Sequence, residues 1–178
     1  MCANEKLPDY PESVCRSATN YQGAWSVRIC SDMPTITSNT DISIAPIHEL
    51  EAVGSVDAVF IVSGPGSRAN LRDEAFMNRV KLDPTRQIIG AIDSGVLFLA
   101  KLGLLKGLTA TTYPGAFTEL ESMGVATLHE TLVVHGNVAS AGGCLSTQDL
   151  VSWMVMRLLG KAISDQMLGM IAKVETST

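Results

Sequence analysis

The amino-acid sequence predicts an α/β protein, a three-layer α/β/α sandwich built around a mostly parallel sheet. Apolar runs of strand length alternate with helical patterns along most of the chain. The clearest change of period lies in residues 87–107, where an apolar run at 88–92 meets a polar turn and apolar residues then recur at helical spacing. A parallel sheet with helices on both faces buries elements that alternate in this way.

The first half of the chain is predicted to contribute strands at residues 25–30, 57–63 and 88–92. Residues 1–23 are predicted to be irregular, because prolines and Gly23 interrupt any period. Short extended pieces are expected around Ile36 and Ile44, and a helical turn at 47–53. The Gly-Pro-Gly turn at 64–66 precedes a predicted helix at 68–80 with Ser67 as its N-cap.

The second half begins with the helix that follows the strand at 88–92. A Thr-rich strand is predicted at 108–113, and Pro114 suits the first position of a helix that runs to 123 and ends at Gly124. Residues 127–134 and 137–141 are predicted to form a hairpin around the His135-Gly136 turn. Helices at 145–159 and 164–174 complete one predicted domain over residues 1–178.

Composition and charge exclude several classes of function. The net charge is −5 and no Lys/Arg cluster is present, so nucleic acid is not an expected partner. No apolar run has the length of a membrane span or the features of a signal peptide, so we expect a cytoplasmic protein without a membrane partner. Only 17% of the residues are charged, which favours a homodimer or another covered face.

The four cysteines predict neither disulfides nor a metal site. They stand at positions 2, 15, 30 and 144, without the close Cys and His spacing of metal ligands. A domain of this size buries enough apolar surface to fold without disulfides. We therefore interpret them as reduced thiols and expect no metal and no cofactor.

Asp93 is the residue around which chemistry is expected. It begins the polar turn Asp93-Ser94-Gly95, directly after the strand at 88–92. In parallel α/β sheets ligands bind at the carboxyl ends of the strands, where the next helix also presents unpaired backbone N–H groups. The expected partner is therefore a small-molecule ligand at this turn.

Four segments, in order, carry a resemblance to a known family. They read DAVFIVSGPGSRANL, IGAIDSGVLFLAKLGLLKGLTATTYPG, LVVHGNVASAGG and the helix that follows, and together they cover residues 57–160. The chain resembles the ThiJ/PfpI superfamily, the flavodoxin-like relatives of class I glutamine amidotransferases. Within it, the isonitrile hydratase-like branch and the sensor domains of AraC-type regulators are most similar. The resemblance implies a flavodoxin-like fold with a nucleophile elbow at Asp93.

The chain departs from the family's pattern in two places. Active members hold a cysteine at the elbow, where this chain has Asp93. Members also begin with a central strand and a loop that brings an acidic residue to the elbow, and this chain resembles the family only from the second strand, residues 25–30. An absent central strand would leave a gap in the sheet that a partner or a rearrangement must fill, because strand edges expose unpaired N–H and C=O groups.

The candidate site residues each have a functional and a structural interpretation. As catalytic groups we predict Asp93 and Ser94, and as ligand-binding groups Gly64, Gly66, Tyr113, Gly143 and Cys144. For Asp93 we favour the simpler role of a helix N-cap. The other structural roles are a first-turn position for Ser94, a tight turn at the two glycines of the 64–66 loop, core packing of Tyr113 and a small buried residue at Cys144.

Three functions remain open at this point. The first is a binding or regulatory module that has lost the Cys-dependent chemistry and holds a small polar metabolite at the elbow. The second is an isonitrile hydratase-like enzyme, in which Asp93 activates water or attacks the isonitrile carbon. The third is a truncated sensor domain of a transcription regulator.

Overall fold

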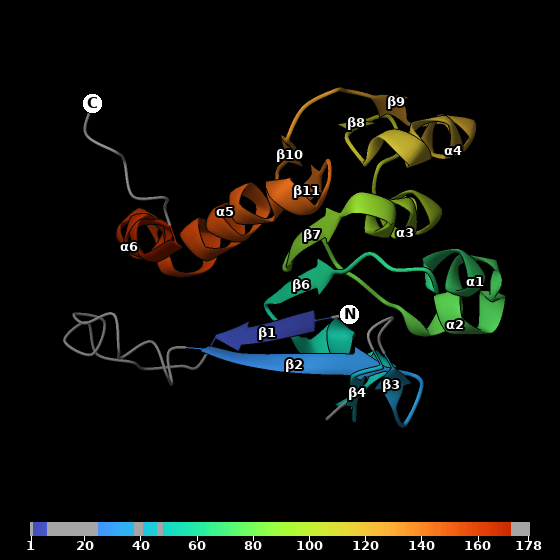
Figure 1. Ribbon diagram of the computed structural model, residues 1–178, viewed down its shortest axis with the longest axis horizontal. Coiled ribbons are helices and arrows are strands. Elements are labelled where there is room, and N and C mark those ends of the chain that lie inside the picture. Colours follow the sequence, from blue (N-terminus) through green and yellow to red (C-terminus); the bar gives the residue numbers. More distant parts are fainter. Residues whose placement is uncertain (1, 7–24, 38–40, 46–47, 172–178) are drawn as a thin grey trace.

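Among the described residues, seven strands form one mixed sheet at the centre of the protein, in the order β10-β11-β7-β6-β1-β2-β5 (Figure 1). The computed structural model describes residues 2–6, 25–37, 41–45 and 48–171. Neighbours β6, β7 and β11 are parallel, as are β2 and β5, whereas β1 and β10 are antiparallel to their neighbours. Most strands therefore run in one direction. In sheet order the strands are Leu132–His135, Val138–Ala141, Ile88–Ile92, Ala58–Ile61, Cys2–Lys6, Trp25–Ser31 and His48–Glu49.

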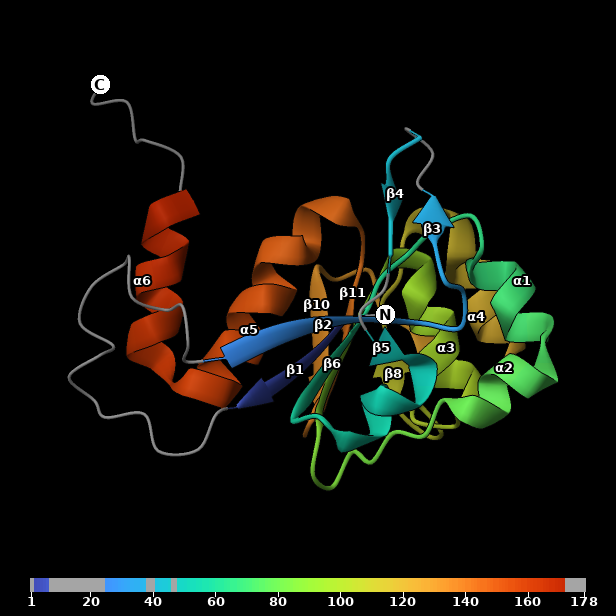
Figure 2. The ribbon, with the colours of Figure 1, turned by 90° about the horizontal axis from the view of Figure 1, so that it is seen from below.

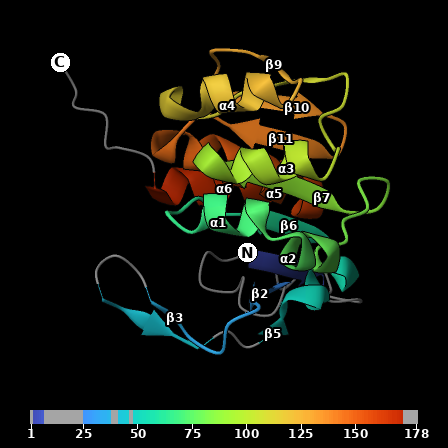
Figure 3. The same cartoon turned by 90° about the vertical axis from the view of Figure 1, so that its right-hand side faces the viewer.

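Helices cover both faces of this sheet. One layer holds α1 (Ser67–Arg72), α2 (Glu74–Arg79), α3 (Val96–Lys101) and α4 (Phe117–Ser122). The other holds α5 (Thr147–Leu159) and α6 (Lys161–Ile171). Figure 2 shows the two layers on opposite sides of the strands, and Figure 3 views the protein from the side of α1 to α4. The predicted three-layer α/β/α sandwich is thus confirmed.

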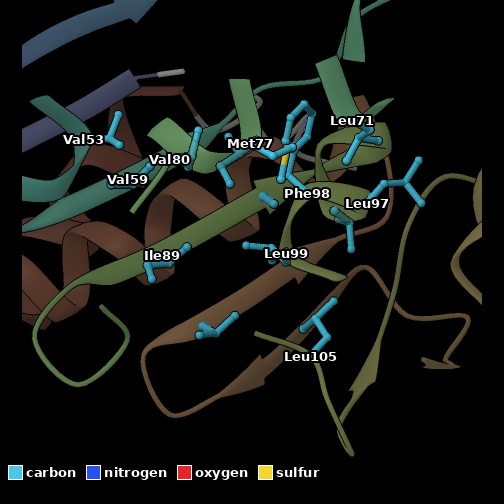
Figure 4. Packing of buried hydrophobic residues seen from close by; sticks show 14 of the residues in the cluster. Val53, Val59, Leu71, Met77, Val80, Ile89, Leu97, Phe98, Leu99 and Leu105 are labelled. Atoms are coloured by element: carbon cyan, nitrogen blue, oxygen red, sulfur yellow. The ribbon is translucent and has the colours of Figure 1, made fainter. Parts of the chain in front are cut away.

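Strand β7 separates two apolar cores, because its alternate side chains point to opposite faces. Ile89 packs with Leu97 and Leu99 in the larger core beneath α1 to α4 (Figure 4). Ile88 and Ile92 pack in the smaller core beneath α5. All five residues of the strand are buried, as its continuous apolar run predicts.

Short elements complete the chain. The 3-10 helices are η2 (Leu50–Ser55), η3 (Asp93–Gly95), η4 (Pro114–Ala116) and η5 (Cys144–Ser146). Two strand pairs lie outside the main sheet: antiparallel β3 (Ile36–Thr37) with β4 (Ser43–Ile44), and parallel β8 (Thr109–Ala110) with β9 (Ala126–Thr127). The extended pieces expected near Ile36 and Ile44 are the first of these pairs.

Three local predictions need correction. The helix expected at 68–80 is interrupted at Asp73, whose carboxylate accepts the N–H of Phe76 and so begins a second helix, α2. Ser67 is the first residue of α1 rather than its N-cap, which is Gly66. The hairpin is present, but His135 pairs with Val138, so its turn is one residue later than the sequence suggested.

The N-terminal prediction is wrong for residues 2–6. These residues form β1, which pairs antiparallel with β2 through Cys2 and Ile29 and with β6 through Cys2 and Phe60. The remainder of the segment predicted to be irregular, residues 7–23, lies outside the described residues. The expected gap in mid-sheet is filled, because a vacant position would leave the backbone groups of both β2 and β6 unpaired. Strand pairing uses backbone groups and does not require apolar side chains. The sequence Cys-Ala-Asn-Glu-Lys has no apolar alternation from which this strand could be predicted.

Candidate functional site

The elbow after β7 has the sharp backbone turn that the sequence predicts. Asp93 has a φ of 54°, in the left-handed region that residues other than glycine seldom adopt, although aspartate tolerates it better than most. The Asp93 side chain is half-buried, and its Oδ1 accepts a hydrogen bond from the N–H of Ser94. Asp93 is the first residue of η3, whose N-cap is Ile92. The favoured N-cap role is therefore wrong, because no side chain caps η3 or α3 and the Asp93 carboxylate accepts only the N–H of the next residue.

Gly95 allows the elbow to pack directly against β6. A Cβ at this position would lie 2.7 Å from the carbonyl oxygen of Ile61 and 3.1 Å from that of Val62. Real Cβ atoms do not approach backbone oxygen atoms so closely, so the position requires glycine. The elbow is therefore held against the carboxyl end of the neighbouring strand.

Parallel pairing places two glycine-containing loops beside the elbow. Ala91 pairs with Ile61 of β6, and Ile92 pairs with Ala141 of β11. The loops that follow these strands, residues 62–66 and 142–143, therefore leave the sheet on either side of Asp93. Thr112 also contacts the elbow, because its Oγ1 donates a hydrogen bond to the Asp93 carbonyl oxygen at 2.8 Å.

Two buried hydroxyl groups connect the elbow to α1. The Oγ atoms of Ser94 and Ser67 are 3.5 Å apart, and the two residues are 4% and 7% exposed. The sequence assigned Ser67 only a capping role, so its contact with the elbow is a functional candidate that sequence reasoning missed. The one available signal was its place directly after the Gly-Pro-Gly turn.

Tyr113 is held by polar groups rather than by core packing alone. Its hydroxyl accepts a hydrogen bond from Nη2 of Arg68 at 3.0 Å, and Nε of the same arginine donates to Oε2 of Glu119 at 2.8 Å. The hydrogen bond to Tyr113, followed by that to Glu119, raises the pKa of Arg68. The three side chains are half-buried and join α1, the loop after β8 and α4. Sequence reasoning missed the arginine and the glutamate.

Cys144 is exposed, so the interpretation of it as a small buried residue is wrong. It begins η5, directly after β11 and the two glycines, and this short helix turns its side chain outward. Gly143 is half-buried and extended, with a φ of −168° that any residue adopts. Neither residue has a contact with Asp93 among the interactions described above.

A cavity of about 460 Å³ lies beside the elbow, between the residues that follow β2 and β6 and the first turn of α1. Gly64, Gly66 and Ser67 line it. The other predicted site residues do not: Asp93, Ser94, Tyr113, Gly143 and Cys144. The structure thus brings the elbow and its loops to one edge of the sheet. Ser67 connects them to the cavity, because it lines the cavity and its hydroxyl lies 3.5 Å from that of Ser94.

Neither a cluster of metal ligands nor a membrane-spanning helix occurs in the part of the chain that the structure describes. No group of three or more His, Cys, Asp or Glu side chains there has the arrangement of a metal site. None of the described helices has the length and apolarity needed to cross a bilayer.

Comparison with known proteins gives the family and several proteins to which this chain is similar. The profile of the DJ-1/PfpI family matches residues 10–156. The isonitrile hydratase of Pseudomonas putida is 23% identical over 133 residues, which make up 74% of this chain and 58% of the hydratase.

Solved structures show the same fold. A ThiJ/PfpI family protein from Pseudomonas syringae superposes with a TM-score of 0.71 at 23% identity, over 84% of this chain and 64% of that one. A proposed transcriptional regulator from Vibrio parahaemolyticus superposes with a TM-score of 0.71 at 18% identity, over 82% of this chain and 80% of the regulator. DJ-1 of Schizosaccharomyces pombe superposes with a TM-score of 0.67 at 14% identity, over 81% of this chain and 80% of DJ-1. The chain therefore spans less than two thirds of the hydratase and of the Pseudomonas syringae protein.

Proposed function

The chain belongs to the DJ-1/PfpI family, and from that premise we propose that it is a small-molecule-binding member that has lost Cys-dependent catalysis. Its ligand is a small polar metabolite held at the elbow, among Asp93, Ser94 and the loops that contain Gly64 and Gly143. Cytoplasmic location and assembly as a homodimer are parts of the same proposal.

The observation that carries this proposal is a carboxylate on an intact elbow. The turn keeps a positive φ at Asp93 and the close packing of Gly95 on β6, so the scaffold that would present a nucleophile is retained. A thiolate attacks electrophilic carbon well because sulfur is intrinsically nucleophilic, whereas a carboxylate is a weaker nucleophile. One oxygen of this carboxylate already accepts the N–H of Ser94. The arrangement favours holding a ligand over attacking it.

An assay with an aryl isonitrile tests the proposal. We expect the wild-type protein to produce no formamide above the buffer rate, and Asp93→Cys to gain turnover if the elbow still presents its side chain for reaction. Asp149→Cys is the matched control, because it adds a thiol at an exposed position of α5. Equal activity of the two cysteine variants would show that the elbow has no special reactivity, and the proposal of a retained scaffold would be abandoned.

A second candidate is an isonitrile hydratase-like enzyme, which the similarity to the Pseudomonas putida enzyme supports. Hydration adds one water to an isonitrile: the oxygen and one hydrogen end on the terminal carbon and the other hydrogen on nitrogen, giving an N-substituted formamide. Asp93 would act as the base that accepts a proton from the attacking water. Formamide production by the wild-type protein that Asp93→Asn abolishes would establish this function in place of the first.

A third candidate is the sensor domain of a transcription regulator. The solved structure from Vibrio parahaemolyticus supports it, since a protein of the same fold has been proposed to be such a regulator. An in-frame DNA-binding segment in the transcript that encodes this chain would establish this function. A transcript without such a segment would remove it.

The homodimer is supported by exposed apolar side chains. Leu145, beside Cys144 at the start of η5, is 98% exposed, and Val27 of β2 is 61% exposed. Sedimentation velocity at two protein concentrations measures the assembly directly. A single species with the mass of one chain at both concentrations would exclude the dimer.

A further inference from the structure

The cavity beside the elbow has the size and shape of a binding site for a small organic molecule. Its volume of about 460 Å³ lies within the range of about 300–1,000 Å³ of ligand pockets. Its walls come from β2, β6, α1 and the segment around β3, so residues far apart in the sequence converge on it. A site of this kind does not depend on the chemistry of Asp93, which does not line it.

The floor of the cavity is apolar and buried. Phe76 and Phe98 form a tilted ring pair with centroids 6.3 Å apart, and Figure 4 shows Phe98 within the larger core. Ile61 and Leu50 complete this floor together with the Cys30 side chain, and all three are at most 2% exposed. A ligand seated here buries an apolar or aromatic part.

The rim is polar but has little charge. Hydroxyl and amide side chains line it: Ser31, Thr35, Thr37, Ser63, Ser67 and Asn70. Asp32 is the one charged side chain among the described residues that line the cavity, and no lysine or arginine is among them. Hydroxyl and amide groups bind uncharged polar groups, and Asp32 favours a cation over an anion.

An arginine that interacts electrostatically with this aspartate, Arg79, is hydrogen-bonded to another carboxylate. Arg79 donates through Nε and Nη2 to the two carboxylate oxygens of Glu51, at 2.5 and 3.0 Å. Its raised pKa has this hydrogen bond as its largest cause, with smaller Coulombic contributions from Asp32 and Glu49. The guanidinium therefore offers no free positive charge to attract an anionic ligand.

We propose that this cavity binds a small amphipathic molecule that is uncharged or carries an amine, with its apolar part on Phe76 and Phe98 and its polar group towards Asp32. The site is distinct from the elbow but joined to it, because Ser67 lines the cavity and its hydroxyl lies 3.5 Å from that of Ser94. The amide of Ser94 therefore reports on occupancy of the cavity.

Three probes of equal size and different charge test the proposal: benzylamine, benzyl alcohol and benzoate. Their affinities are measured by titration with ¹⁵N chemical shifts and by calorimetry on the full chain. We expect saturable binding of benzylamine and benzyl alcohol, a shift of the Ser94 amide, and benzoate weaker than benzylamine by about fivefold or more. Asp32→Lys reverses that preference, whereas Glu130→Lys, at an exposed position outside the cavity, leaves it unchanged.

A matched pair of larger substitutions tests the location. Asn70→Trp fills the cavity from α1 and is expected to abolish binding of benzyl alcohol. Asn78→Trp makes the same change at an exposed position of α2 that does not line the cavity, and retains binding of benzyl alcohol. Circular dichroism and thermal unfolding confirm that both variants fold. Three outcomes would each overturn the proposal: benzylamine and benzyl alcohol fail to bind, benzoate binds with equal affinity, or Asn70→Trp leaves binding intact. None of these outcomes affects the interpretation of the isonitrile assay at Asp93.

Discussion

Substitution of Gly95 by alanine tests whether the elbow packs on β6 as closely as the structure shows. The added Cβ would lie 2.7 Å from the Ile61 carbonyl oxygen, well inside the 3.4–4 Å of ordinary van der Waals contact. Ile61 cannot move away easily, because β6 pairs with β7 through Ile61 and Ala91. Forcing atoms into a packed interior costs about 1–3 kcal/mol. We expect a loss at the upper end of that range, because the opposing atom belongs to backbone rather than to a flexible side chain.

Gly66→Ala is the matched control. Gly66 and Gly95 both precede a short helix and both have right-handed helical backbone angles, with φ values of −71° and −61°. A Cβ at Gly66 meets no atom within 4 Å. Since an alanine restricts the unfolded chain equally at both positions, the difference between the variants isolates the steric cost at Gly95.

Urea unfolding followed by circular dichroism measures both free energies of unfolding. We expect Gly66→Ala to stay within about 1 kcal/mol of the wild type. Gly95→Ala should lose about 2–3 kcal/mol, which lowers the midpoint of thermal unfolding by about 4–12 °C for a domain of this size. Equal stability of the two alanine variants would refute the close contact between the elbow and β6.

Three further substitutions have expected outcomes. Gln87→Met should lower the free energy of unfolding, measured in urea, by about 2–4 kcal/mol. The reason is that the Gln87 side chain is 1% exposed and hydrogen-bonds three backbone groups at 2.7–2.9 Å. An unchanged stability would contradict those bonds. Ala3→Pro should cost about 1–3 kcal/mol by removing a backbone donor from β1, and full stability would mean that residues 2–6 do not pair in mid-sheet. Arg79 holds the pKa of Glu51 below its ordinary value of 4.5, so the contribution of this pair to stability is present above that pH and is lost as the pH falls through the lower pKa of the folded state. In an NMR titration Arg79→Gln should raise the pKa of Glu51, and an unchanged value would show that the ion pair does not form in solution.

The parts of the fold that were predicted correctly are those with a local pattern. Strand β7 has a continuous apolar run, and α5 has helical spacing that ends at Gly160, whose φ is 93°. Strand β1 has no such pattern and was predicted to be irregular. Its position depends on the unpaired backbone of its two neighbours, which becomes apparent only when the sheet is assembled.

For the candidate site, the sequence by itself determined the elbow. The change of period at Asp93 and the Gly-Pro-Gly turn predict a sharp bend and a loop at the same edge of a parallel sheet, because parallel strands end together. Tertiary structure alone decided which side chains meet there. Arg68 reaches Tyr113 and Glu119, which follow it by 45 and 51 residues, and Ser67 reaches Ser94. Local periodicity records which face of an element is buried, whereas contacts between distant elements, and the cavity that they enclose, depend on how the layers pack in three dimensions.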